Sequence, residues 1–95
     1  MRLKQETVAH IRCAITSVLP DADVYLFGSR VDDTERGGDI DFMVLGTREL
    51  TWQEKADIKR TIESLIGEQR IDIISYTHDA SDPFKAVALT EAVKL

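Results

Sequence analysis

The chain has 95 residues, a net charge of −5 and a single cysteine, Cys13. This length predicts one domain over residues 1–95, and the negative charge argues against direct binding to a nucleic-acid backbone, which uses clustered Lys and Arg. A lone cysteine excludes an internal disulfide and is typical of a reducing compartment. The charged N-terminal segment does not resemble a signal peptide, and no run reaches the ~20 apolar residues of a membrane helix, so we expect a cytoplasmic protein.

The first half of the chain predicts one helix and two strands. Apolar residues recur at helical spacing over residues 3–19, and Pro20 ends this helix. Residues 24–27 form a short apolar run of β-prone residues, which predicts a strand. A loop over residues 28–38 leads into a second predicted strand over residues 39–45.

The second half predicts a helix, a strand and a final helix. The sequence TWQE at residues 51–54 has the form of a capping box, and Gly67 suits the end of the helix that follows. Residues 70–76 predict a third strand, and Asp82 followed by Pro83 predicts the start of the last helix. The predicted order is αβ(loop)βαβα, an α/β (α+β) fold with a small mixed sheet flanked by helices.

The connections between the strands constrain their directions. A helix between the second and third strands is the usual crossover between parallel neighbours. The first and second strands are joined by the loop alone, and its length permits either direction.

Three aspartates fall on the predicted strands. Asp39 and Asp41 alternate along the second strand and therefore point to the same face, and Asp72 lies near the start of the third strand. If these strands are parallel, the three carboxylates converge at one edge of the sheet. Such a cluster of like charges requires a cation, and Mg²⁺ prefers carboxylate oxygens and brings substrate phosphates with it. Two such ions form a common clamp for phosphoryl or nucleotidyl displacement.

A Gly-Ser pair precedes the aspartates. Gly28 permits close approach of a phosphate to the backbone, and the hydroxyl of Ser29 can donate to it. For Ser29 to lie near Asp39, the first two strands must be antiparallel. Taken singly, these residues have plainer interpretations, such as a simple turn, an exposed sheet edge, or an ion pair between Asp72 and Arg70.

These motifs in this order resemble a known family. Gly28-Ser29, nine intervening residues, Asp39-Ile-Asp41 and a later acid, Asp72, are similar to the signature of minimal nucleotidyltransferases in the DNA polymerase β superfamily. The ending DPFKAVALTEAVKL also resembles the last helix and tail of these small proteins. The resemblance spans nearly the whole chain.

The resemblance implies roles for the site residues. Asp39, Asp41 and Asp72 would hold two Mg²⁺ ions, and Asp72 would help to activate the attacking hydroxyl. The nucleotide, most simply ATP, would be bound by residues of the loop: Gly28, Ser29, Arg30, Arg36 and Gly38. The loop arginines could equally pair with the acids at positions 32, 33 and 35, and the acids at 32 and 33 depart from the small or basic residues of many relatives.

The resemblance also implies a partner. Minimal nucleotidyltransferases resemble antitoxins whose partner is a HEPN-domain toxin, so transfer of AMP from ATP to a tyrosine of such a toxin is the leading hypothesis. The alternative is a binding-only antitoxin or regulatory subunit that masks its partner. A third and weaker hypothesis is a small-molecule transferase, which usually carries an added acceptor-binding domain. A homo-oligomer or hetero-oligomer is compatible with each hypothesis.

The remaining distinctive residues favour structural roles. We expect Trp52 to lie in the core or in a hydrophobic staple, with a partner interface as the alternative, and Cys13 to be half-buried. Phe84 and Val87 should pack the last helix on the sheet, or form an exposed apolar patch if that helix is only partly covered.

Overall fold

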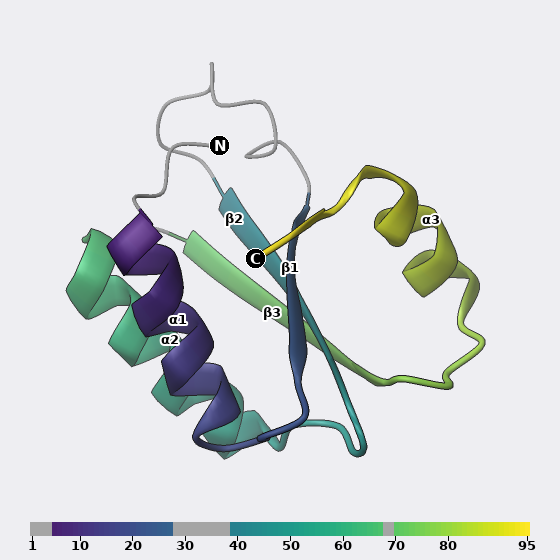
Figure 1. Cartoon of the computed structure of the whole chain (residues 1–95), viewed down its shortest axis with the longest axis horizontal. Coiled ribbons are helices and arrows are strands. Elements are labelled where there is room, and N and C mark those ends of the chain that lie inside the picture. The colour runs from purple at the N-terminus through teal and green to yellow at the C-terminus, as the bar shows by residue number, and fades with distance from the viewer. Residues whose placement is uncertain (1–4, 28–38, 68–69) are drawn as a thin grey trace.

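The computed structural model describes residues 5–27, 39–67 and 70–95 (Figure 1). The elements follow the predicted order, with one additional strand at the end. In chain order they are α1 (Gln5–Thr16), β1 (Asp23–Phe27), β2 (Asp39–Gly46), α2 (Trp52–Ile66), β3 (Arg70–Thr77), α3 (Pro83–Glu91) and β4 (Val93–Lys94).

The four strands form one mixed sheet in the order β3-β2-β1-β4. β2 runs parallel to β3, with α2 as the connecting helix, and β1 runs antiparallel to β2. The mixed sheet predicted from the sequence is therefore confirmed. The antiparallel pair brings the end of β1 next to the beginning of β2, as the hypothesis of a joint phosphate and metal site requires.

The two faces of the sheet have separate cores, because successive residues of a strand point to opposite faces. Ile40 and Phe42 of β2 are buried against α1 and α2 in the larger core. Met43 and Leu45 belong to a smaller cluster that α3 covers through Ala88. Figure 1 shows α1 and α2 side by side along one side of the sheet, with α3 on the other side.

The predicted ends of α2 and the predicted start of α3 are confirmed, whereas α1 ends at Thr16 and not at residue 19, because a hydrogen-bonded turn onto the Ile15 carbonyl precedes Pro20. Thr51 caps α2, with the Glu54 backbone N–H donating to its hydroxyl at 3.1 Å and the Thr51 N–H donating to the Glu54 carboxylate at 2.8 Å. The two Nη atoms of Arg48 also donate to this carboxylate, each at 2.9 Å. Gly67 ends α2 with φ of 89°, which only glycine adopts easily, and the carboxylate of Asp82 caps α3.

The short strand β4 was not predicted. Val93 and Lys94 pair antiparallel with β1, and the N–H of Leu95 continues the pairing by donating to the Val24 carbonyl at 2.8 Å. The side chain of Leu95 packs against the larger core. A strand of two residues has too few positions to show the alternation that identifies longer strands.

Two side-chain predictions were wrong, those for Trp52 and Cys13. Trp52 is 75% exposed rather than part of the core, because it begins α2 away from the buried stripe of that helix. Cys13 is exposed, since it lies two residues from the buried Ile11 and therefore on the other side of α1. Phe84 and Val87 are 48% and 66% exposed, so the alternative of an apolar patch on a partly covered helix holds. Within the described residues, no helix is long and apolar enough to cross a membrane.

Candidate active site

The candidate site lies where the end of β1 meets the beginnings of β2 and β3. Asp41 is the register partner of Asp72 in β3 on one side and of Phe27 in β1 on the other. Neighbouring strands lie about 4.8 Å apart, and register partners point to the same face of the sheet. Asp41 and Asp72 therefore lie side by side on the face that α3 partly covers.

The third predicted metal ligand is placed only by its backbone. Asp39 begins β2 as the register partner of Arg70, and its side chain is outside the described part of the structure. The loop residues predicted to bind the nucleotide are also outside the described residues and stay predictions: Gly28, Ser29, Arg30, Arg36 and Gly38. The segment that holds them starts directly after Phe27, beside Asp41.

The paired carboxylates suit a hard cation. Asp41 is half-buried and Asp72 is exposed. Carboxylates at directly opposed positions of neighbouring strands repel each other, and a divalent cation bound to their oxygens removes this repulsion. Carboxylate oxygen is the donor that Mg²⁺ prefers, so the donor set fits this ion. Among the described side chains no three His, Cys, Asp or Glu residues gather to hold a metal, so the predicted centre depends on Asp39 as its third ligand.

Arg70 adds a positive charge at the same edge of the sheet. It begins β3 two residues before Asp72, so both residues belong to the same face of the strand. A guanidinium offsets carboxylate charge and offers several N–H donors to a phosphate. From the sequence, Arg70 was predicted only as an ion-pair partner of Asp72; its position opposite Asp39 follows from the register of the parallel strands.

An aromatic pair borders the carboxylates. The rings of Phe27 and Phe84 meet edge to face, with their centroids 6.0 Å apart and an interplanar angle of 72°. Phe84 belongs to α3, so this contact joins the helix to the strand residue next to Asp41. A role for Phe27 was not predicted, although its position immediately before the Gly-Ser pair was an available signal.

Tyr76 lies farther along the same face of β3. Partial burial, together with the negative charge of Asp82, raises the pKa of the Tyr76 hydroxyl above its usual range. The hydroxyl is therefore protonated at neutral pH and does not serve as a base. At this end of the face, the described carboxylates that are suited to accept a proton or bind a metal are those of Asp41 and Asp72, whereas Asp23 lies at the opposite end.

A second group of charged residues lies at the opposite end of the strands. Nε2 of His78 is 3.3 Å from a carboxylate oxygen of Asp21, and Nζ of Lys94 is 3.4 Å from one of Asp23. Asp23 is the register partner of Leu45, four residues along β2 from Asp41. These contacts tie the strand ends together and are separate from the candidate site.

Comparisons with known proteins identify the family and support the fold. The profile of the family described as polymerase beta, nucleotidyltransferase, matches residues 21–95. A solved structure of a protein assigned as a minimal nucleotidyltransferase is 26% identical, with a TM-score of 0.67, and the match covers 99% of this chain and 98% of that one. No curated protein matches the chain.

Two other solved structures are toxin–antitoxin complexes. One contains a tri-AMPylated HEPN toxin of Shewanella oneidensis with its MNT antitoxin, at 20% identity and a TM-score of 0.69, and the match covers 97% of this chain and 71% of that one. The other is a toxin–antitoxin structure with AMP-PNP, at 21% identity and a TM-score of 0.73, covering 97% and 72%. At these identities the likeness shows a shared fold.

Proposed function

Because the chain belongs to the polymerase beta nucleotidyltransferase family, we propose that it is a Mg²⁺-dependent transferase that moves AMP from ATP to a hydroxyl group of another protein. It would act in the cytoplasm as a single catalytic domain. The observation that carries the proposal is the register of Asp41 with Asp72, directly beside the end of β1. The support is that two carboxylates, the kind of ligand that Mg²⁺ prefers, adjoin the strand end from which the segment with the Gly-Ser pair starts.

Each residue has a defined role in the proposed reaction. The carboxylates of Asp39, Asp41 and Asp72 would hold two Mg²⁺ ions, which neutralise the triphosphate and polarise the α-phosphate when bound. Gly28 and Ser29 would bind the phosphates, with Arg30, Arg36 and Gly38 in the same loop. The acceptor oxygen would bond to the α-phosphorus as the bond to pyrophosphate breaks, and Asp72 would accept the proton of the acceptor hydroxyl.

The proposed acceptor is a tyrosine of a HEPN-domain toxin, so that the chain would act as an antitoxin. The support for this partner is the likeness to complexes between HEPN toxins and MNT antitoxins, one of which holds an AMPylated toxin. The likeness to a structure with AMP-PNP supports an adenine nucleotide as the donor.

A second candidate is a binding-only antitoxin that masks its partner. The exposed apolar side chains of α3 favour this candidate, because they are suited to contact with another protein and take no part in metal or nucleotide chemistry.

Two measurements separate these candidates. Calorimetric titration with ATP should show binding that requires Mg²⁺ and is lost in the Asp41→Asn/Asp72→Asn double variant. Incubation with the HEPN-domain protein of the same genome should then raise the mass of that protein by AMP groups. The transferase proposal would be overturned in favour of masking by two results together. The double variant would still inhibit the partner, and the partner would gain no mass when it is incubated with the native chain.

A further inference from the structure

The helix α3 exposes apolar side chains and buries its only positive charge. Phe84 and Val87 are 48% and 66% exposed, whereas Lys85 is only 8% exposed. A surface helix normally has the reverse arrangement, with apolar residues facing the core and charged residues facing water. The outward face of α3 is thus unlike that of an ordinary solvent-exposed helix.

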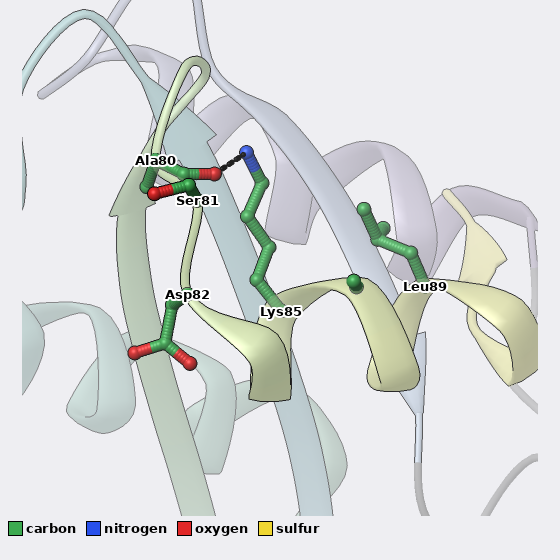
Figure 2. Close-up of a pocket in the computed structure, with 6 residues that line it drawn as sticks. Ala80, Ser81, Asp82, Lys85 and Leu89 are labelled. Atoms are coloured by element: carbon green, nitrogen blue, oxygen red, sulfur yellow. Dashed lines mark hydrogen bonds between the residues drawn. The ribbon is translucent and has the colours of Figure 1, made fainter.

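Lys85 explains why α3 keeps this orientation. Its Nζ donates to the carbonyl oxygens of Thr77, His78 and Ala80 at 3.4, 2.6 and 3.0 Å, which accounts for all three ammonium donors. Figure 2 shows the side chain extending from the helix to the loop between β3 and α3, where it meets the Ala80 carbonyl. Burial of an ammonium group costs free energy unless the group is hydrogen-bonded. A rotation of α3 that buried Val87 would break the three charge-assisted hydrogen bonds of Lys85.

The exposed apolar side chains adjoin the candidate site. Phe84 packs against Phe27, and Phe27 is the register partner of Asp41. Val87 follows Phe84 by three residues, so the two side chains lie on neighbouring parts of the helix surface. A molecule seated on Phe84 and Val87 would therefore be next to the carboxylates.

The charges around these residues are negative. Of the exposed ionisable residues on α3 and the loop before it, three are acidic, Asp79, Asp82 and Glu91, and the fourth is His78, since the lysine of the helix is buried. These acidic residues form a rim that disfavours a second copy of a chain whose net charge is −5. The rim suits a protein that presents an apolar depression edged by Lys and Arg.

We propose that Phe84 and Val87 form the surface on which the acceptor protein docks, so that its target hydroxyl reaches Asp41 and Asp72. The occupant is the HEPN-domain protein itself, which rests on the proposed function. Apolar side chains would supply most of the binding energy, and the acidic rim would orient the basic edge of the partner.

The test compares α3 with an exposed apolar residue elsewhere. Phe84→Ser, Val87→Ser and Trp52→Ser each remove an exposed apolar side chain, but Trp52 begins α2, which packs on the opposite face of the sheet. The dissociation constant for the purified HEPN-domain protein of the same genome is measured by biolayer interferometry. We expect an increase of about tenfold or more for Phe84→Ser and of several-fold for Val87→Ser, with less than twofold for Trp52→Ser. Thermal unfolding shows whether each variant is folded. If Phe84→Ser unfolds because it loses the contact with Phe27, the affinity of Val87→Ser alone decides the test.

The outcomes are distinct. Unchanged affinity in the folded α3 variants, or no complex with the native chain, would overturn the docking surface even if ATP binding is normal. Self-association of the native chain that Val87→Ser abolishes would also overturn it, in favour of a second copy. By contrast, a partner that binds through α3 but never receives AMP would support the surface and overturn the proposed transfer.

Discussion

The two faces of the sheet are built differently. The face under α1 and α2 is closed by two helices and contains the larger core, including the fully buried Ile11, Phe42 and Ile62. The other face carries a smaller cluster under the single helix α3, and its open end carries Asp41 and Asp72. Adjacent residues of one strand therefore have different roles: Phe42 packs in the larger core, and Asp41 belongs to the candidate site.

Because the two faces differ, substitutions on the closed face should affect stability and substitutions near the carboxylates should affect chemistry. A closed, apolar face supplies free energy of folding in proportion to the area that it buries. Opposed carboxylates on the other face reduce that free energy to the extent that positive charge does not compensate them. We therefore expect substitutions in the closed face to lower the free energy of unfolding. Substitutions of the carboxylates should instead lower the rate of AMP transfer.

The largest expected effect is the loss of transfer when the carboxylate pair is broken. Asp72→Asn should lower the rate of AMP transfer by at least about a hundredfold, because a metal ligand and proton acceptor is removed. Its free energy of unfolding in metal-free buffer should be unchanged or higher, since the repulsion from Asp41 is relieved. Rates come from mass spectrometry of the acceptor and stabilities from urea denaturation. Asp57→Asn, on the exposed surface of α2, is the matched control. If Asp72→Asn is instead destabilised and active, the assignment of chemistry to this face is wrong.

On the closed face, substitutions should lower the stability of the fold. Ile62 is fully buried on α2, so Ile62→Ala should lower the free energy of unfolding by about 2–5 kcal/mol through lost burial and the cavity that remains. Leu65→Ala, on the same helix at 36% exposure, should cost about 1 kcal/mol or less. Urea denaturation of the two variants gives the comparison. Similar losses for both would show that the core under α2 is looser than the burial of Ile62 indicates.

Much of this architecture could be predicted from local sequence signals. The helix between the second and third predicted strands indicated a parallel pair, and this pair places Asp41 opposite Asp72. The TWQE sequence indicated the capping box of Thr51. These predictions succeeded because a crossover and a cap depend on few residues that are close in sequence.

The orientation of α3 could not be predicted in the same way. Periodicity suggested that Val87 faces the sheet, but it is 66% exposed. The carbonyl groups that bind Lys85 belong to the turn after β3, and no sequence pattern shows that they converge. A lysine within an otherwise apolar helix was the one available signal. For the loop that would bind the nucleotide, the predictions rest on the Gly-Ser motif and the resemblance.

Removing the buried lysine should have an intermediate effect, confined to the smaller face. Lys85→Met keeps the aliphatic stem but leaves the carbonyl groups of the β3–α3 loop without their donor, so the free energy of unfolding should fall by about 1–3 kcal/mol. Hydrogen exchange should show the greatest loss of protection in α3. Lys59→Met on α2 provides the control. Uniform loss of protection across α1 and α2 would contradict a local role for Lys85.

The smallest expected effect concerns the cap of α2, at the end of the closed face. Hydrogen bonds from Arg48 lower the pKa of Glu54 to about 2 in the folded chain, against an ordinary value of 4.5. A depressed pKa stabilises the fold above pH 4.5, and this contribution is lost as the pH falls from 4.5 toward 2. The melting temperature of the native chain should therefore exceed that of Glu54→Gln by a small margin at pH 6, and the margin should shrink toward pH 2.5.

Because the ion pair is exposed to solvent, added salt should reduce the margin as well. The affinity for Mg²⁺ and ATP should be the same in both proteins, since Glu54 contributes to the end of a helix on the face away from the carboxylates. A margin that is constant with pH would mean that the cap acts through hydrogen bonding alone, independent of the charge on Glu54.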